Sequence, residues 1–323
     1  MREWATMTAL LLRLAAMLLA APLATAVAPD NARAAVVCSV VNSGLNFGSA
    51  LTGTGTVNWS CTGDNASTTT LNLCLQLGAP SSPGTAAQPQ MINGSSTLNF
   101  NVYRNASTTN IWTTTTPLVQ SITVGAGIGT TVTGSFTFYG LIPAGQLAEA
   151  GNYSASFSNT LLGFANPAGN NCQVVRSGNS GTSFLLPIAA TIPNVCTVDA
   201  LANVNLGTIA AGAPVTPGST TIRVVCTNGT AYNIGVLPSN NNSSGAGIMS
   251  GTNGNPETVA YQLRRTSGTG AIWGNTATST SAGNGVGGTG TGANQDYTVF
   301  ASVPNSNVRP DTYSDTVRVT VNY

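Results

Sequence analysis

Few side chains in this chain can carry acid–base or nucleophilic chemistry. The 323 residues include no histidine, and all ten basic residues are arginine, so imidazole and the lysine amine are both missing as proton-transfer groups. The carboxylates lack the paired spacing that glycoside hydrolysis requires. Beyond residue 35 they are Asp64, Glu149, Asp199, Glu257, Asp296, Asp311 and Asp315. The sequence therefore predicts a protein that is not an enzyme, with no catalytic residues and no cofactor.

Six cysteines are the remaining reactive side chains, and they are candidates for disulfides or for a metal site. They are Cys38, Cys61, Cys74, Cys172, Cys196 and Cys226. A metal site is the weaker interpretation, because the chain has no CxxC pair and no histidine to complete a zinc site. An even number of cysteines in an exported chain favours disulfides, which form in oxidising compartments.

The N-terminus predicts export. Residues 1–26 have the layout of a secretory signal peptide: Arg2 and Arg13 flank an apolar run that small residues follow. Cleavage after Ala26 and cleavage after Ala34 fit the small-residue pattern equally well. No later stretch is apolar for long enough to span a bilayer, so we expect the mature chain to be soluble after export.

The composition excludes some partners. Only 6% of the residues are charged, against roughly 25% in ordinary soluble domains. Removal of residues 1–26 takes away two arginines and one acid, which leaves eight basic and eight acidic residues. A net charge near zero gives no attraction to phosphates, so we expect no nucleic-acid partner.

Disordered chains can have a similar composition, but the regular β-type runs and the cysteines argue against disorder here.

The elements that position these residues are predicted to be strands, and their sequence pattern occurs twice along the chain. Alternating runs rich in Thr and Val dominate, with no helical periodicity, so we expect an all-β protein of two sandwiches. Segments of the first half recur in order in the second: Cys38–Val40 and Cys196–Val198, 45–48 and 204–207, 59–63 and 225–229, 100–104 and 259–264, Ile111-Trp112 and Ile272-Trp273, 136–143 and 297–304, and strands beginning at Tyr153 and Tyr313.

The repeat predicts the disulfides. Cys38 and Cys61 enclose a loop like the one between Cys196 and Cys226, so we expect the pairs Cys38–Cys61 and Cys196–Cys226. Cys74 and Cys172 are then left to pair within the first copy.

The second copy ends one strand early. The first copy continues after its Tyr153 strand into a further apolar run at 184–190, whereas the second ends with the strand at 313–323. We therefore expect a domain at 35–192, completed by its own last strand, and a domain at 193–323 that lacks one. A sandwich without its last strand exposes unpaired backbone groups and an apolar groove, here beside Val317, Val319 and Val321.

These motifs resemble the spore coat protein U domain family, the subunits of archaic chaperone-usher (Csu-type) pili. The resemblance implies two immunoglobulin-like sandwiches, the second of which lacks its last strand. It also implies assembly by donor-strand complementation, with a periplasmic chaperone, an outer-membrane usher and the next pilin subunit as partners. The two-domain layout is similar to the tip adhesins of these pili, which function in attachment and biofilm formation at the cell surface.

The segment before Cys38 also favours the tip. Cleavage after Ala26 leaves 27–37, a segment that contains Pro29 and two charges and does not alternate, and cleavage after Ala34 leaves three residues. Neither segment makes a good donor strand, so we expect this subunit to accept a strand but not to give one.

Attachment is expected to involve apolar residues in the loops of the first domain. The segments near 62–69, 105–130 and 161–182 are predicted to lie at the pole that faces away from the second domain. The candidates for contact with a hydrophobic or host surface are Leu161, Leu162, Phe164, Leu118 and Val119. Trp112 has a counterpart in Trp273 and is better assigned to the core. A glycan-binding adhesin and a secreted structural coat or stalk protein are the alternative functions.

Overall fold

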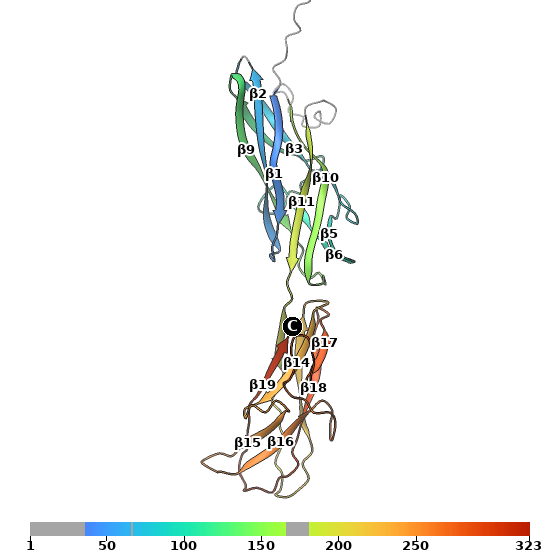
Figure 1. Cartoon of the computed structure of the whole chain (residues 1–323), viewed down its shortest axis with the longest axis vertical. Helices are drawn as coiled ribbons and strands as arrows, with labels where there is room; N and C mark the ends of the chain where they lie inside the picture. Colours follow the sequence, from blue (N-terminus) through green and yellow to red (C-terminus); the bar gives the residue numbers. More distant parts are fainter. Residues whose placement is uncertain (1–35, 66, 166–180) are drawn as a thin grey trace, which may run out of the picture.

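The structure, a computed structural model, describes residues 36–65, 67–165 and 181–323 (Figure 1). The predicted signal peptide and both of its cleavage points lie outside these residues, as does Cys172. Within the described residues, no helix is long and apolar enough to cross a membrane.

The described chain forms two β-sandwiches that follow one another end to end (Figure 1), which confirms the predicted all-β class. The first domain contains β1 (Val36–Asn46), β2 (Thr52–Asn65), β3 (Thr69–Gln76), β4 (Ala79–Pro80), β5 (Gln90–Asn93), β6 (Ser96–Asn99), β7 (Asn101–Tyr103), β8 (Leu118–Val124), β9 (Gly127–Leu141), β10 (Gly151–Ala165) and β11 (Thr182–Ile192). The second contains β12 (Cys196–Ala200), β13 (Gly218–Cys226), β14 (Ala231–Pro238), β15 (Ala246–Ser250), β16 (Thr258–Arg264), β17 (Val286–Thr289), β18 (Gln295–Ser302) and β19 (Val317–Asn322).

The two domains differ in how their layers join. In the first domain a continuous path of pairing runs β6-β5-β10-β11-β1-β2-β9-β7, and β3 extends the β10 side toward β8. The strand β1 pairs antiparallel with β2 and, at its end, parallel with β11, so it connects the two layers. In the second domain a five-stranded sheet, β12-β13-β18-β16-β15, faces a separate three-stranded sheet, β17-β14-β19.

Each domain has a tryptophan at the centre of its core. Trp112 and Trp273 are both 1% exposed, and each indole N–H donates to a backbone carbonyl, that of Leu75 (3.2 Å) or Ile234 (3.1 Å). A buried indole needs such a partner, because an unpaired polar group in the core is costly. The Ile-Trp repeat in the sequence is therefore structural, and Trp112 is a core residue.

Disulfides join the first two strands of each domain. Cys38 and Cys61 are directly opposite each other on β1 and β2, with Cα atoms 4.0 Å apart, and Cys196 and Cys226 are 4.1 Å apart on β12 and β13. Closing loops of these lengths stabilises each domain by about 3 to 4 kcal/mol in the chain-entropy model. Cys74 is buried and disulfide-bonded; its predicted partner Cys172 lies outside the described residues.

A tyrosine corner begins the same strand in both domains. The Tyr153 hydroxyl donates to the carbonyl of Glu149, and the Tyr313 hydroxyl donates to that of Arg309, both at 2.8 Å and both four residues upstream. Such corners are typical of immunoglobulin-like sandwiches. The two tyrosines therefore fix the correspondence between β10 in the first domain and the segment leading into β19 in the second.

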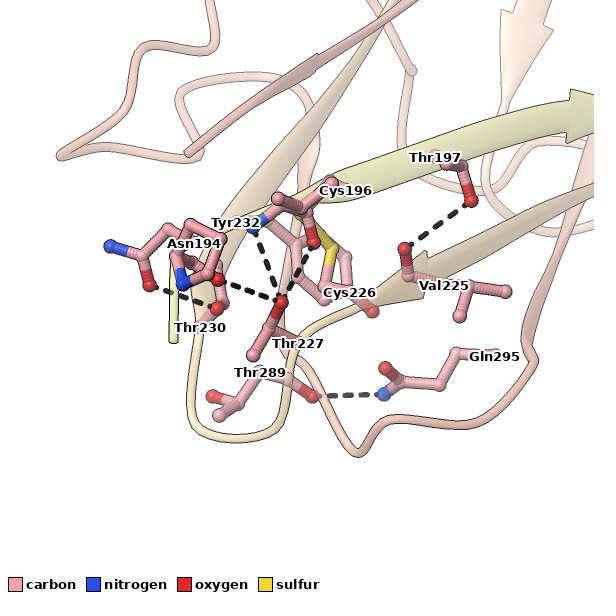
Figure 2. The surroundings of a disulfide bond; sticks show 12 residues. Asn194, Cys196, Thr197, Val225, Cys226, Thr227, Thr230, Tyr232, Thr289 and Gln295 are labelled. Atoms are coloured by element: carbon pink, nitrogen blue, oxygen red, sulfur yellow. Dashed lines mark hydrogen bonds between the residues drawn. A yellow bond between two sulfur atoms is a disulfide. The ribbon is translucent and has the colours of Figure 1, made fainter. Parts of the chain in front are cut away.

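A short connection, residues 193–195, joins the domains and is held at both ends (Figure 2). The Thr227 hydroxyl donates to the carbonyl of Pro193 (3.0 Å), and the Thr227 N–H donates to that of Val195 (2.9 Å). Figure 2 shows the Thr230 hydroxyl donating to the Asn194 side chain (3.0 Å), next to the Cys196–Cys226 disulfide. These bonds fix the path of the chain from one domain into the other.

The loop between β9 and β10 makes a second contact across the joint. The Ala150 N–H donates to the Asn228 carbonyl (3.1 Å), and the Asn228 side-chain amide donates to the Leu147 carbonyl (3.0 Å). The loop is itself anchored, because the Gln146 amide donates to the carbonyl of Asn99 (2.9 Å). Two separate contacts, at the linker and at this loop, resist bending better than one.

Replacing Asn228 with alanine should loosen this joint without unfolding either domain. The change removes the side-chain donor to Leu147 but leaves both cores intact, so we expect a wider spread of molecular dimensions in small-angle X-ray scattering and an unchanged thermal transition. Asn294→Ala, at an exposed position of the same domain, is the matched control. If the N228A variant scatters like the unaltered chain, the side-chain bond to Leu147 is not needed to hold the joint.

Candidate functional site

The strand β11 completes the first domain from within. It runs antiparallel to β10, where Phe157 pairs with Leu186, and parallel to the end of β1, where Leu45 pairs with Ile188. Every second residue faces inward, and Leu186, Ile188 and Ala190 are at most 2% exposed. The backbone and the core on both sides of β11 are therefore satisfied by the chain itself.

The second domain has no strand in the corresponding place. Among the described strands, β19 pairs with β14 and forms one edge of the three-stranded sheet, while β12 forms one edge of the five-stranded sheet. In the first domain the equivalent edges, those of β10 and β1, are bridged by β11. The unpaired backbone groups along such edges form a template for an added strand.

The segment after β12 lies on one side of this place. In the first domain Leu45 and Phe47 pack beside β11 and are 3% and 4% exposed. Their counterparts Val204 and Leu206 are half-buried, and residues 201–210 form no strand. Val204 and Leu206 are apolar, like the residues at the same positions of the first copy, but without a neighbouring strand they are incompletely covered.

The strand β19 lies on the other side. Val317, Val319 and Val321 pack against the core of the second domain and remain half-buried, whereas Phe157 and Leu162 on β10 are at most 1% exposed. The predicted groove residues therefore lie along the unpaired edge of β19. Exposed apolar surface of this kind favours association, at roughly 25 cal/mol per Å² that a partner covers.

A carboxylate holds the approach to β19 in place. Asp311 accepts hydrogen bonds from the hydroxyl of Thr252, from the N–H of Thr252 (2.9 Å) and from the side chain of Asn255 (2.8 Å). These bonds, that from the Thr252 hydroxyl first, lower the pKa of Asp311 to about 2. Asn255 also donates to the Tyr313 hydroxyl (3.0 Å). The loop between β15 and β16 is thereby tied to the tyrosine corner that precedes β19.

The residues predicted to contact a surface gather around β3 rather than at the end of the domain. The β8 residues Leu118 and Val119 pair with Leu75 and Cys74, and Leu161 pairs with Gln76 from the other side. Val119 is 54% exposed, but Leu118, Leu161 and Phe164 are half-buried. Residues 105–117 likewise lie on the flank, because Ile111 bridges to Tyr103 of β7.

The prediction for Leu162 is wrong. Its side chain is 0% exposed, within the core, and cannot reach a surface. A β-bulge between Phe157 and Thr160 shifts the alternation by one residue, with Asn159 at a positive φ of 57°. Thr160 and Leu162 therefore face inward, and Leu161 faces away from the main core.

The start of β9 lies at the end of the first domain far from the joint, at the top of Figure 1. The β2–β9 register puts Asn65 beside Gly127 at this end and Thr52 beside Leu141 at the other. Ile128, between β8 and the rest of β9, is 90% exposed. Sequence reasoning missed this residue, although an isolated isoleucine within Gly125-Ala126-Gly127-Ile128-Gly129 was a visible signal.

The turn at Ile128 is well ordered. Gly127 and Gly129 have φ values of 119° and 78°, which residues with a side chain adopt rarely. The Thr130 hydroxyl donates to the carbonyls of Ala126 (3.2 Å) and Gly127 (3.0 Å). Ile128 is thus held out into solvent by a braced turn.

Charge is divided unequally between the domains. The described residues of the first domain include three charged side chains, Asp64, Arg104 and Glu149, whereas residues 193–323 include ten. In the second domain Arg223 and Asp296 form a bidentate ion pair at 2.8 Å. The described surface of the first domain therefore presents almost only hydroxyls, amides and apolar groups.

Comparison with known proteins identifies the family to which the chain belongs. The Spore Coat Protein U domain family matches residues 24–160 and again 182–320, so the chain belongs to this family, as its motifs predicted. None of the curated proteins matches the chain.

Among solved structures, the chain is similar to the CsuC–CsuE chaperone–tip adhesion subunit pre-assembly complex of the archaic chaperone-usher Csu pili of Acinetobacter baumannii. The identity is 19%, the TM-score is 0.51, and the match covers 89% of this chain and 100% of that one. It is also similar to the CupB6 tip adhesin of Pseudomonas aeruginosa, at 13% identity and a TM-score of 0.31, over 89% of this chain and 93% of that one. The first likeness shows a shared two-domain fold.

The Asp311 hydrogen bonds predict a specific acid sensitivity. Because the folded-state pKa of about 2 lies below the unfolded value of about 3.9, Asp311 stabilises the fold above about pH 4 and loses that effect as the pH falls through 2. We expect Asp311→Asn to flatten the decline of the second-domain Tm between about pH 4 and 2. Calorimetry of the full chain measures this, with Asp64→Asn as the control; an unchanged slope in the D311N variant would contradict the assignment.

Proposed function

We propose that this chain is the tip subunit of an archaic chaperone-usher pilus, exported through the periplasm to the cell surface. The observation that carries the proposal is the contrast between the domains: β11 fills the first sandwich, and the corresponding place in the second is open. A strand supplied by another chain would complete the second domain by main-chain pairing, with alternate side chains entering the groove.

The partners follow from that requirement. During export the groove needs a temporary strand, which a periplasmic pilus chaperone supplies; in the fibre, an outer-membrane usher exchanges it for the extension of the next pilin subunit. The first domain has no free place for a strand, since β11 occupies it. The chain is thus joined to the fibre through its second domain, and the first domain is left at the tip.

Attachment is the function proposed for the first domain. Its distal end presents Ile128 on a braced turn, within a domain that carries few charges in its described part. Covering an exposed isoleucine removes apolar area from water and needs no charge complementarity. This favours hydrophobic surfaces, on which such attachment would begin biofilm formation.

Expression in a periplasm tests assembly. We expect the full chain to accumulate only with the pilus chaperone and to copurify with it, because its groove is otherwise open. Residues 1–192 alone should yield a soluble, protease-resistant domain without the chaperone, because β11 is encoded within them. A full chain that is monomeric and protease-resistant without any partner would overturn the proposal.

Attachment is tested by Ile128→Asp. The change places a charge at this turn, and we expect binding to alkyl-coated beads to fall at least about 10-fold, from the roughly 1.5 to 3 kcal/mol that burying such a side chain provides. The Tm should not change, since Ile128 is 90% exposed. The unaltered chain should bind almost equally at low and high salt, because few charges contribute.

Val119→Asp is the matched control, at an exposed position on the flank around β3. If V119D lowers binding and I128D does not, the contact surface is the flank around β3 and not the turn at Ile128. If neither variant lowers binding to alkyl-coated beads, attachment by apolar contact is wrong.

A further inference from the structure

The groove of the second domain differs in shape from the space that β11 fills in the first. We infer, on the basis of the proposed function, that it takes a strand in the register of β11 but with a bulkier, aromatic-sized side chain opposite Val317. The partner is thus an extended segment of another subunit, with a larger side chain at this position than the Leu186 of β11.

The register comes from the internal repeat. The tyrosine corners equate Tyr153 with Tyr313, so Phe157 and Val317, each four residues further on, correspond to each other. In the first domain Phe157 pairs with Leu186 of β11. The residue of an incoming strand that takes the place of Leu186 therefore lies opposite Val317.

The opposite wall is set in the same way. Leu45, which pairs with Ile188, and Phe47, whose N–H donates to the Ala189 carbonyl (2.9 Å), correspond to Val204 and Leu206. An incoming strand can therefore pair parallel with residues 204–207, as β11 pairs with β1. That segment, irregular at present, would become a strand when the partner arrives.

The difference in shape lies in a column of aromatic rings. In the first domain Phe100 contacts Phe47 and Phe157 edge to face, with ring centroids 6.4 and 6.0 Å apart. All three rings are at most 4% exposed. The side chains of β11 complete a layer that is already filled by aromatic rings.

The second domain retains one ring of this column. Leu141 and Ser302 occupy the same position in the repeated segments 136–143 and 297–304. Leu141 pairs with Asn101 and Ser302 pairs with Gln262, so the preceding residues, Phe100 and Tyr261, correspond as well. Tyr261 is 6% exposed and donates to the Asp315 carboxylate (2.6 Å). The other two rings are replaced by Leu206 and Val317. Ring-sized volume is therefore missing from the walls, and a partner must supply it to reach normal packing density.

Appending a strand to the full chain tests the inference. A copy of residues 180–192 is joined after Tyr323 by an Asn-Gly turn, so that it runs back antiparallel to β19 with its first residue opposite Tyr323 and its Leu186 opposite Val317. Three appended copies are compared: the natural sequence, Leu186→Phe and Leu186→Ala. We expect the second-domain Tm to rise in the order Ala, Leu, Phe, and the Leu206 amide to become protected from hydrogen exchange.

The same substitution in the natural β11 is the matched control. There Leu186 is 0% exposed against intact aromatic packing, so Leu186→Phe overfills the site and should lower the Tm of the first domain. We therefore expect Leu186→Phe to raise the second-domain Tm in the appended copy and to lower the first-domain Tm in the natural β11. An appended Leu186→Phe copy that stabilises no better than the natural copy overturns the inference, although stabilisation by either copy supports an open groove.

Failure of the proposed function gives a different outcome. If no appended copy changes the Tm or the chaperone dependence of the full chain, the groove does not accept a strand, and both the proposed assembly and the inferred pattern are wrong. A copy with Leu186→Asn and Ile188→Asn, which keeps the backbone pairing but not the apolar inward face, should stabilise least. If it stabilises as well as the natural copy, the inward side chains do not decide the fit.

Discussion

Strand pairing on both sides of β11 is the interaction on which the organisation of this chain depends. Antiparallel bonds to β10 and parallel bonds to β1 close the first sandwich, and they make Leu45 and Phe47 core residues. Where the strand is missing, in the second domain, the same positions become half-buried, the pairing path breaks into two sheets, and residues 201–210 lose their strand. One absent strand thus changes burial, sheet topology and local backbone structure together.

The two copies share the features that hold their framework together, and they differ at the place that β11 fills in the first domain. Both keep the disulfide between their first strands, the buried tryptophan that donates to a backbone carbonyl, and the tyrosine corner. None of these lies between β19 and the edge formed by β12. The second domain therefore keeps this framework without a strand beside β19, where burial is incomplete.

Much of this was visible in the sequence because the chain can be compared with itself. Spacing alone predicted the Cys38–Cys61 and Cys196–Cys226 disulfides, and the order of motifs predicted the unmatched strand at 184–190. Leu162 was misplaced because a bulge reverses the alternation within β10, and a bulge depends on backbone pairing that residue types do not reveal. Ile128 was missed because the exposure of its side chain depends on where the paired strands β2 and β9 end, which periodicity does not specify.

The division of charge fits the division of labour between the domains. Ten charged residues lie in the second domain, where Arg223 pairs with Asp296 and Asp311 organises the loop before β19. These groups hold an open framework in place. A domain that adheres by excluding water gains nothing from charges near its contact surface, since each would have to be desolvated. The near absence of charge in the described first domain therefore agrees with the proposed attachment by apolar contact.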